Sequence, residues 1–417
     1  MKIILSHPTG NANVRATARA LLNANLLAKF ITSIASFSGS MLDNLSFFKP
    51  LSAIRRRSYD SALKDLTITS PWREAARLAA AKFGLGKLIE HEKGVFSIDS
   101  IYQNLDKKVA TTLERSCKRN VKGVYAYEDG AVHSFRIARS LGLQCFYDLP
   151  TGYWRAASRL LEKEKEQWPE WISTMTGFDD SEKKLAQKDE ELRLANCVLV
   201  ASEFTVKTLK EYPGNLPHVE LIPYGFPQTC PKENYPQLSR SRPLKLLFIG
   251  KLSQQKGIAD LFTAVEEIGT GIELTVVGRK PTEKCYPLNL ALAKHRWIPT
   301  LSHQGILRCM QEHDVLVFPS LFDGFGLVIT EAMSQGIPVI ASDRSAGPSL
   351  ISHDQNGWLV QAGSIQDLKN AIENLLYKPN LIKATGLQAI ESAKKRPWLV
   401  YETELANAVN KQLISFT

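Results

Sequence analysis

The residues best suited to chemistry lie in one stretch, SLFDGFGLVITEAMSQGIPVIASD, at residues 320–343. Asp323 opens a glycine-containing loop, and Glu331 follows eight positions later in a segment compatible with a helix. Glycine lets a backbone come close to a ligand, and the first amides of a helix favour an anion. The spacing therefore predicts a phosphate site at the amides of Gly324, Phe325, Gly326 and Leu327.

The two acids suit the groups that would flank such a phosphate. Glu331 lies too far inside the predicted helix to meet the anion, but its carboxylate can accept hydrogen bonds from the hydroxyls of a ribose. Asp323 can do the same for a sugar on the other side. A ribose, a diphosphate and a hexose in this order describe a nucleotide-sugar.

Two lysines in GKLSQQKG, residues 250–257, could serve the diphosphate. Lys251 and Lys256 would neutralise the charge that builds on a leaving diphosphate. Two solvent-exposed lysines are the plain alternative. Their place after an apolar strand, in the same half of the chain as Asp323 and Glu331, favours the functional interpretation.

The surrounding elements predict an α/β protein with two doubly wound halves. The first half has apolar runs of about five residues, typical of strands buried on both faces, separated by helix-compatible segments; they lie at residues 2–6, 123–127, 144–149, 197–201 and 219–226. Residues 15–30 read as a helix, and Ser202 reads as the N-cap of another. A proline-rich linker, 227–243, precedes a second series at residues 244–250, 273–278, 314–320, 338–342 and 356–360.

The predicted domains follow from this division. Residues 1–235 form an N-terminal Rossmann-like, acceptor-binding domain, and residues 236–395 form a C-terminal Rossmann-like, nucleotide-sugar-binding domain. Residues 396–417 form a final helix. Ligands of open α/β sheets bind at the carboxyl ends of the strands, so a cleft between the two halves is the expected site.

The pattern acid-G-F-G-x-x-x-x-Glu, followed by AM and GIPVIAS, resembles the retaining family-4 glycosyltransferases of the GT-B fold. GKLSQQKG, ANCVLVASEFTVKTL and VELIPYGF are similar to other segments of that family. The resemblance is strong over 195–360 and faint over 30–120. It implies transfer of a hexose-type sugar from a nucleotide diphosphate sugar, with a UDP-sugar favoured, without metal or cofactor. It also implies that the last helix returns to the first domain.

The family's roles carry over to matching residues. Lys251, Lys256 and Asp323 are the predicted catalytic residues, and Glu331 holds the ribose. The base rests on HRWIP, residues 295–299, which contributes Arg296, Trp297 and Ile298. Gly10 and Asn11, in the first loop, approach the diphosphate from the other domain.

The acceptor side departs from the family pattern. Many members carry a histidine after the strand that corresponds to QCFYDL, and this chain has DLPTG at residues 148–152. Glu128 and Asp129, at the end of another strand, are the predicted acceptor-binding residues. His133 is a further candidate, although its position inside a predicted helix also fits a histidine without a role.

The alternatives are other classes of protein on the same scaffold: a sugar phosphorylase, a nucleotide-sugar epimerase, or a nucleotide-sugar-binding protein without activity. Motifs of other classes are absent from the sequence, including D-x-D, the P-loop, the dinucleotide fingerprint, the nucleophile elbow and metal-ligand histidine spacing. No metal is predicted. The expected acceptor is a saccharide or a lipid-linked saccharide, in surface polysaccharide or glycolipid synthesis.

The charge is uneven along the 417 residues. Residues 1–120 hold 19 Lys and Arg against 9 Asp and Glu, which accounts for the whole net charge of +10. FFKPLSAIRRRSY (47–59) and SPWREAARLAAAKFGLGKL (70–88) mix bases with apolar residues. Such surfaces suit anionic lipid or a phosphorylated acceptor, and a solvated basic face is the plain alternative. We expect no nucleic-acid partner, since no nucleic-acid module is recognisable.

The six cysteines form no C-x-x-C pair, and the first residues carry no long apolar run. Both features predict reduced thiols and a cytoplasmic protein, with the inner face of the membrane as a second predicted location.

Overall fold

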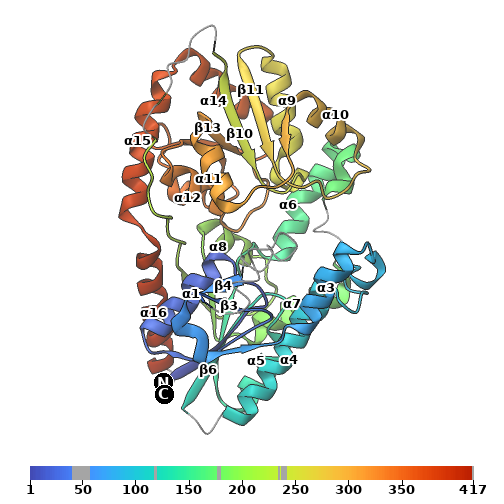
Figure 1. Ribbon diagram of the computed structural model, residues 1–417, viewed down its shortest axis with the longest axis vertical. Helices are drawn as coiled ribbons and strands as arrows, with labels where there is room; N and C mark the ends of the chain where they lie inside the picture. Colours follow the sequence, from blue (N-terminus) through green and yellow to red (C-terminus); the bar gives the residue numbers. More distant parts are fainter. Residues whose placement is uncertain (40–56, 117–119, 176–179, 233–234, 236–241, 416–417) are drawn as a thin grey trace.

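The structure is a computed structural model that describes residues 1–39, 57–116, 120–175, 180–232, 235 and 242–415. Two parallel β-sheets, each covered by helices, stack along the long axis of the molecule (Figure 1). In the described residues, no helix is long and apolar enough to cross a bilayer.

The first sheet has seven parallel strands in the order β5-β2-β1-β6-β7-β8-β9. Its inner strands are buried on both faces, as the uninterrupted apolar runs predict. The strands are β1 (Lys2–Ser6), β2 (Leu27–Thr32), β5 (Thr67–Thr69), β6 (Val121–Tyr127), β7 (Gln144–Asp148), β8 (Cys197–Val200) and β9 (His218–Leu221). A small pair, β3 (Ser36–Phe37) and β4 (Ser58–Tyr59), lies outside this sheet.

Helices and short 3-10 turns connect these strands. They are α1 (Ala12–Asn23), η2 (Ser61–Leu66), α3 (Trp72–Lys82), η3 (Gly86–Leu88), α4 (Ile98–Ser116), α5 (Val132–Ser140), α6 (Trp154–Gln167), η4 (Pro169–Thr174), α7 (Glu182–Leu194) and α8 (Glu203–Leu209). Ser202 caps α8 as predicted, because its hydroxyl accepts a hydrogen bond from the amide of Thr205 at 3.1 Å.

The second sheet has six parallel strands in the order β12-β11-β10-β13-β14-β15. They are β10 (Leu244–Ile249), β11 (Ile272–Val277), β12 (Arg296–Ile298), β13 (Val315–Phe318), β14 (Val339–Ser342) and β15 (Trp358–Val360). Around it lie η6 (Gln254–Lys256), α9 (Ile258–Ile268), α10 (Tyr286–Lys294), α11 (His303–Gln311), α12 (Leu327–Ser334), α13 (Gly347–Leu350), α14 (Ile365–Tyr377) and α15 (Asn380–Lys395).

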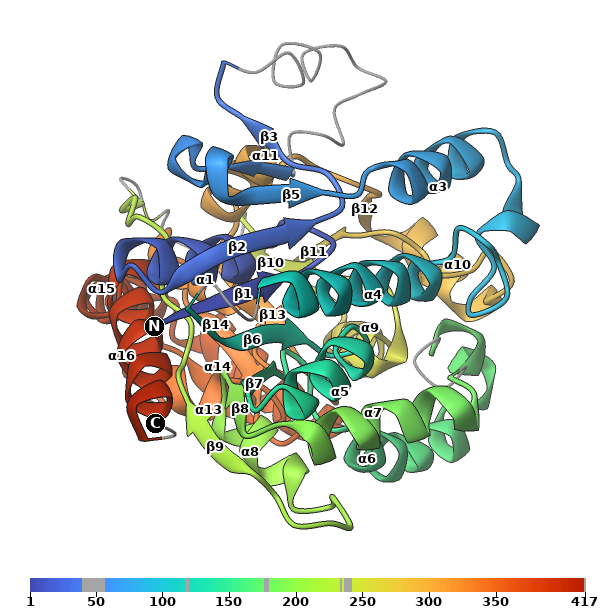
Figure 2. The ribbon, with the colours of Figure 1, turned by 90° about the horizontal axis from the view of Figure 1, so that it is seen from below.

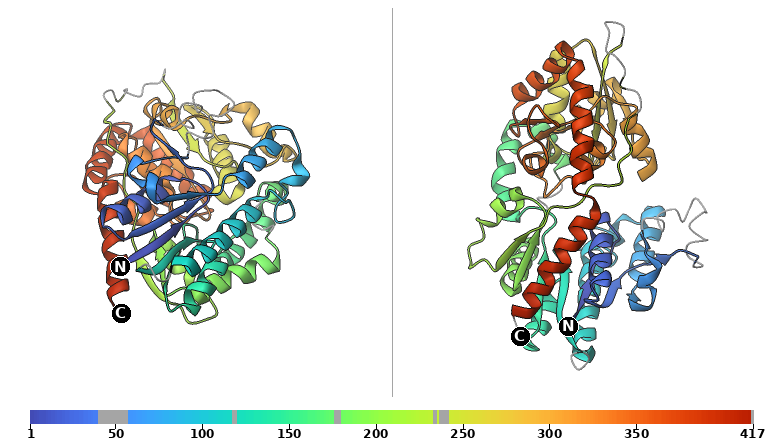
Figure 3. Two further views of the ribbon diagram at one scale, coloured as in Figure 1. Left: turned by 60° about the horizontal axis from the view of Figure 1, so that its bottom comes forward. Right: turned by 90° about the vertical axis from the view of Figure 1, so that its left-hand side faces the viewer.

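The last helix, α16 (Trp398–Ser415), returns to the first domain. The views in Figure 3 show it continuing from α15 down the side of the first sheet. Tyr401, Leu405, Val409 and Leu413 are buried in the same core as Ile3, Leu5 and Val14. This confirms the predicted crossing and ties the two domains together at the ends of the chain.

A second crossing runs the other way and was not predicted. Helix α6 leaves the first domain, and Trp171 of η4 is buried in the core of the second domain against Phe262, with ring centroids 6.2 Å apart. The amide of Gln254 donates to the hydroxyl of Thr174 at 3.1 Å. The predicted boundaries 1–235, 236–395 and 396–417 stay a proposal, and residues near 168–174 pack with the second unit.

The sequence prediction was wrong at the first helix. Residues 15–30 were expected as one helix, but α1 ends at Asn23 and Leu27–Thr32 forms β2. Asn25 between them has a left-handed φ of 56°, which breaks the helix. The short strands β5 and β12 were not predicted either.

Candidate functional site

The loops after the strands of both sheets meet between the domains. The carbonyl of Gly324, after β13, accepts hydrogen bonds from the hydroxyls of Ser202 and Thr205, after β8. A Cβ on Gly324 would lie 2.0 Å from the carbonyl oxygen of Pro150, after β7. The carboxyl edges of the two sheets therefore face each other, as the doubly wound fold predicts.

Lys256 and Asp323 form an ion pair at this edge. Lys256 ends η6, after β10, and Asp323 follows the neighbouring strand β13. Both side chains are about one-fifth exposed, at 21% and 19%. Gly257 has a φ of 67° and lies so close to Pro319 that a Cβ would be 2.1 Å from its carbonyl oxygen. The close packing of these two loops brings the predicted catalytic lysine to the predicted catalytic acid.

The start of α12 differs in part from the predicted row of four amides. The amide of Phe325 donates to Oδ1 of Asp323 at 3.0 Å, so it is already paired, and its ring packs against Tyr224 with centroids 4.8 Å apart. Gly324 is a contact between the domains. Gly326, with a φ of 83°, and Leu327 begin the helix, and no hydrogen bond from their amides to a described residue is present. The predicted anion site would therefore offer the amides of Gly326 and Leu327 and not that of Phe325; it stays a prediction.

Glu331 lies one turn inside α12, with 21% of its side chain exposed. Burial raises the pKa of its carboxyl to about 7. The titratable group within ion-pair distance of it among the described residues is His303, whose Nδ1 lies 3.6 Å from Oε1. A desolvated carboxylate with so few partners can accept the hydroxyls of a ligand.

Arg15 brings the first domain to the same place. Burial lowers the pKa of His303, and the nearby charge of Arg15 lowers it further, so α1 and the start of α11 lie close together. The Arg15 guanidinium donates to the carbonyl of Gly10. Asn11 is exposed at the start of α1. The predicted approach of Gly10 and Asn11 to a ligand is compatible with this loop, and it stays a prediction.

The predicted base-binding segment is divided between two ends of the second sheet. Trp297 and Ile298 are half-buried, and the Trp297 indole donates to the carbonyl of Gly278, after β11, at 2.9 Å. Arg296 instead lines a cavity of about 760 Å³ at the amino-terminal ends of the strands, with Lys245, Ile272 and His313. The predicted contact of Arg296 with the base has no support from this position, because the residue begins β12 and the cleft lies at the other end; it stays a prediction.

Lys251 lies on the same loop as Lys256, at the end of β10, and its side chain is exposed. Its carbonyl accepts a hydrogen bond from the amide of Ser253 at 2.9 Å. The loop thus carries two lysines: Lys256, which pairs with Asp323, and Lys251, which is more exposed. The role of Lys251 stays a prediction.

A second cavity, of about 170 Å³, lies between the domains beside the Lys256–Asp323 pair. Gln255 and Phe322, the neighbours of that pair in sequence, form one wall. The other walls belong to the first domain and consist of Glu128, Thr151, Gly152, Trp154, Ala157, Ser158, Leu161, Asp180, Leu185 and Lys188. A carboxylate, a lysine and an aromatic ring in one hollow suit a polar ligand with an apolar face, such as a sugar.

Glu128 is held in place at this cavity. Its Oε2 accepts from the Thr151 hydroxyl at 2.8 Å, and its Oε1 lies 3.6 Å from Nζ of Lys188. Burial alone would lower the pKa of Lys188, but Glu128, Asp129 and Asp180 raise it. The lysine therefore stays charged between three carboxylates.

The Asp129 side chain is more exposed than that of Glu128, at 28% against 11%, but it lies outside the cavity. Its backbone is left-handed, with a φ of 70°, and its amide donates to Glu191 at 2.9 Å. Burial and the neighbouring Glu128 raise the pKa of Asp129 to about 6. Its carboxylate faces Lys184 and Lys188, at 3.8 and 3.7 Å, and it does not line the cavity described above. Glu128 is the better acceptor candidate.

His133 begins the first turn of α5. Its amide, with that of Ser134, is bound by the buried carboxylate of Asp106 on α4, at 2.6 and 2.9 Å. It is absent from the residues that line the cavity, so the structure gives no support to its predicted acceptor role.

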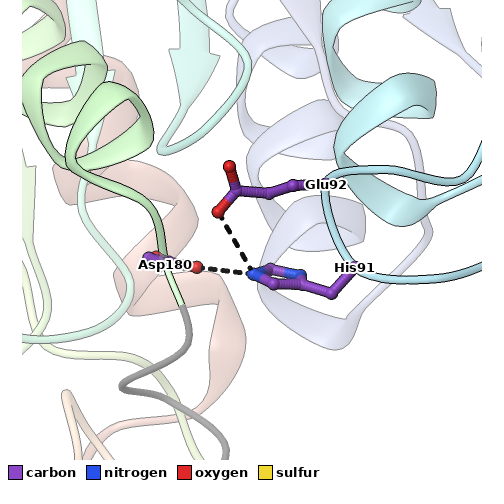
Figure 4. A group of neighbouring side chains, drawn as sticks. All are labelled: His91, Glu92 and Asp180. Atoms are coloured by element: carbon purple, nitrogen blue, oxygen red, sulfur yellow. Dashed lines mark hydrogen bonds and ion pairs between the residues drawn. The ribbon is translucent and has the colours of Figure 1, made fainter.

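Three side chains near this cavity lie close enough together to hold a metal ion: His91, Glu92 and Asp180 (Figure 4). Nε2 of His91 lies 2.9 Å from Asp180 and 3.5 Å from Glu92. Asp180 also pairs with Lys184 and Lys188, at 2.9 and 3.1 Å. Two lysines already neutralise this acid and would repel a cation. We interpret the group as an ion-pair network.

Several residues of the cleft were not predicted from sequence. Arg15, His303, Gln255, Trp154 and Phe322 lie on five different segments and share no motif. For two of them a neighbouring residue pointed to the site in the sequence: Gln255 precedes Lys256, and Phe322 precedes Asp323.

Comparison with solved structures shows the class of fold. Sucrose-phosphate synthase from Thermosynechococcus elongatus is similar over 100% of both chains, with a TM-score of 0.67 and 17% identity. Anabaena Alr3699/HepE, solved in complex with UDP, is similar over 99% of this chain and 100% of its own, with a TM-score of 0.62 and 16% identity. The chain has the predicted GT-B fold.

Sequence comparison relates the second half of the chain to known proteins. Residues 232–396 match the model of glycosyl transferases group 1. The phosphatidyl-myo-inositol mannosyltransferase of Mycobacterium leprae is 29% identical over 177 residues, which cover 41% of this chain and 46% of that protein. Over these residues the chain is similar to the group 1 glycosyl transferases, as its motifs predict. The match spans less than half of that mannosyltransferase.

Proposed function

We propose that the chain is a retaining glycosyltransferase that moves a hexose-type sugar from a nucleotide diphosphate sugar to a hydroxyl of a saccharide or lipid-linked acceptor. One arrangement carries the proposal: the Lys256–Asp323 pair lies between the start of α12, with Glu331, and the cavity of Glu128. The start of α12 with Glu331 suits a nucleotide, and the cavity of Glu128 suits a sugar. The reacting centre would therefore lie between them, at the Lys256–Asp323 pair.

The donor would lie along the second domain. Its ribose would bind Glu331, and its diphosphate would bind the amides of Gly326 and Leu327 with Lys251 and Lys256. Asp323 would hold hydroxyls of the donor sugar. Because Lys256 pairs with Asp323 in the free protein, an arriving diphosphate would draw the ammonium toward itself and release the carboxylate for the sugar.

The chemical step would need orientation and charge more than a strong base. The diphosphate leaves on the face that the acceptor hydroxyl attacks, and its oxygen can take the acceptor proton. The lysines and amides stabilise the charge that develops on the leaving group. Glu128 would orient the acceptor beside Lys188.

The likeness to a structure with bound UDP supports a UDP-sugar as donor. The first experiment is thermal stabilisation by UDP-, GDP-, ADP- and TDP-sugars, with the bare diphosphates as controls, since a ligand of the native state raises Tm. We expect a shift with UDP and its sugars that is lost in Glu331→Ala. No shift with any nucleotide would contradict the proposal.

The other activities predict different results. A phosphorylase would require inorganic phosphate and no nucleotide, an epimerase would interconvert the donor sugar without an acceptor, and a binding protein would show neither transfer nor hydrolysis. The anomeric configuration of the product, read by NMR, tests retention.

A further inference from the structure

An unusual number of large apolar side chains is exposed in one part of the first domain. Six of them lie between residues 72 and 98, which we name the 72–98 surface: Trp72 at 55%, Phe83 at 73%, Leu85 at 50%, Leu88 at 37%, Val95 at 57% and Ile98 at 59%. Every residue from Ala81 to Leu88 is exposed. Elsewhere in the described chain, exposed apolar residues are more scattered.

Contacts within the segment bring Trp72 and the turn of Leu85 and Leu88 together through Phe96. The Trp72 ring packs edge-on against Phe96, with centroids 6.1 Å apart. The amide of Phe96 donates to the carbonyl of Leu88 at 2.9 Å, and Leu85 and Leu88 belong to one turn. Figure 2 shows α3 at the periphery of the first domain, away from α16.

The charges on this surface are mainly positive. Lys82, Lys87 and Lys93 are exposed, and Glu90 is the exposed acid among them, paired with Lys93 at 3.1 Å. The two other acids of the segment are less exposed: the buried carboxylate of Glu74 pairs with Arg57 and Arg77, and the side chain of Glu92 is 24% exposed. Arg57 is therefore a core residue and not part of the predicted basic surface, while Arg55 and Arg56 lie outside the described residues.

None of the six exposed apolar side chains lines one of the three cavities described in this structure. The cavity beside them, of about 190 Å³, is lined by the polar residues Arg73, Glu92, Asp99, Ser100, Gln103, Asn104 and Lys107. Exposed aromatic and aliphatic side chains with lysines between them match the interface of an anionic bilayer, where apolar groups enter the acyl boundary and ammonium groups meet phosphates.

The 72–98 surface is attached to the proposed acceptor cavity. His91 contacts Asp180 at 2.9 Å, and the carboxylate of Glu92 accepts from the amide of Ser181 at 2.7 Å. Asp180 itself lines the cavity. One short segment thus carries exposed apolar residues on one side and contacts the cavity wall on the other.

We propose that the 72–98 surface docks the protein on an anionic phospholipid bilayer and so presents a lipid-linked acceptor to the cavity of Glu128. The acceptor part of this inference rests on the proposed function; the docking part does not. The bilayer would take up Phe83, Leu85 and Leu88, and the lysines would bind lipid phosphates.

The test is flotation of the full chain with vesicles of phosphatidylcholine alone and of phosphatidylcholine mixed with phosphatidylglycerol. We expect binding to the mixed vesicles that weakens when salt is raised from about 0.1 M to about 1 M. The double variant Phe83→Ser with Leu85→Ser should lower the vesicle affinity by at least about tenfold, since two exposed side chains no longer leave water.

The matched control is Tyr377→Ser with Leu387→Ser, whose side chains are 83% and 47% exposed on the second domain. We expect this control to bind vesicles like the wild type. Equal losses in both double variants, or no flotation of the wild type, would overturn the proposal. A dimer would also overturn the proposal, if light scattering detects it in the wild type and only the double variant Phe83→Ser with Leu85→Ser is monomeric. A second copy of the chain would then cover the surface.

Donor-induced thermal shifts separate this inference from the proposed function. If the wild type does not bind vesicles but both it and Phe83→Ser with Leu85→Ser bind the donor, the membrane-docking inference fails and the transferase proposal stands. If vesicles bind but no nucleotide-sugar does, the proposed function fails, and membrane docking remains without its acceptor role.

Discussion

Gly324 lies against Pro150 so closely that a Cβ on the glycine would sit 2.0 Å from the proline carbonyl oxygen. The two residues belong to loops from different sheets, so this contact sets how closely the domains approach beside the cleft. We expect Gly324→Ala to push the loops apart, with a cost of about 1–3 kcal/mol in the free energy of unfolding. Urea unfolding measures this cost.

The matched control for this change is Gly86→Ala, because a Cβ at Gly86 meets no atom within 4 Å. That variant should keep the stability of the wild type. If Gly324→Ala is as stable as Gly86→Ala and transfers sugar at the same rate, the contact does not constrain the domains.

Glu331 gives a prediction on donor affinity and pH. Burial raises the pKa of its carboxyl to about 7, and only the carboxylate accepts hydrogen bonds from both ribose hydroxyls. Donor affinity should therefore rise as pH increases from about 6 to about 8. Glu331→Gln should bind donor about tenfold more weakly at pH 8 and lose most of this pH dependence. Calorimetric titration with the diphosphate nucleotide measures both effects.

The free protein should show the opposite trend in stability. Because the folded pKa of Glu331 is raised above the ordinary value, its contribution to stability is complete below about 4.5 and is lost as pH rises through about 7. Glu331→Gln should remove that part of the decline. If Glu331→Gln binds the donor as tightly as the wild type at every pH, the assignment of Glu331 to the ribose is contradicted.

Lys256 should act mainly on turnover. Lys256→Met keeps much of the side-chain volume and removes the charge that would stabilise the leaving diphosphate. We expect kcat to fall by about a hundredfold or more and donor affinity to fall much less. Single-turnover transfer and direct binding separate the two. Lys210→Met, an exposed lysine on the surface, is the control. Equal losses of rate and affinity would indicate plain ground-state binding.

Much of the fold could be predicted because the inner strands are apolar on both faces and end at loops with recognisable residues. β13 and the loop to Glu331 show this clearly. The prediction failed where local sequence is ambiguous, as at Leu27–Thr32, whose apolar residues continue a helical pattern. It also failed where a long-range contact decides the position, as for Trp171, buried in the second core.

The candidate site shows the same limit. The spacing of Asp323 and Glu331 along one loop and helix could be read directly, and Lys256 followed from its place after a strand. Nothing in the sequence indicated that Asp323 would bind both Lys256 and the amide of Phe325. The sequence also did not indicate that Arg296 would be the first residue of β12 and lie away from the cleft, so its contact with the base stays a prediction.

Glu128 should decide acceptor affinity. It lines the cavity and is held by Thr151 and Lys188. Glu128→Gln should raise the acceptor KM by about tenfold, while donor binding and donor hydrolysis stay unchanged. His133→Ala is the comparison, because His133 lies outside the cavity and should leave the acceptor KM unchanged. A larger effect at His133 than at Glu128 would reverse our assignment of the acceptor side.

Asp148 gives the last prediction, on the stability of the first domain. It is buried at the end of β7, and Oδ2 accepts a hydrogen bond from the Tyr125 hydroxyl at 2.6 Å. Burial raises the pKa of its carboxyl to about 7, so its contribution to stability is present below the ordinary value of 3.8 and is lost as pH rises through about 7.

Asp148→Asn keeps an acceptor for Tyr125 and removes the charge. It should be more stable than the wild type by about 1–3 kcal/mol at pH 8 and of similar stability near pH 4. Asp148→Leu removes the acceptor as well and should be destabilised at both pH values. Urea unfolding of the three proteins at both pH values measures these differences. If Asp148→Asn is no more stable than the wild type at pH 8, the assignment of a raised pKa to Asp148 is contradicted.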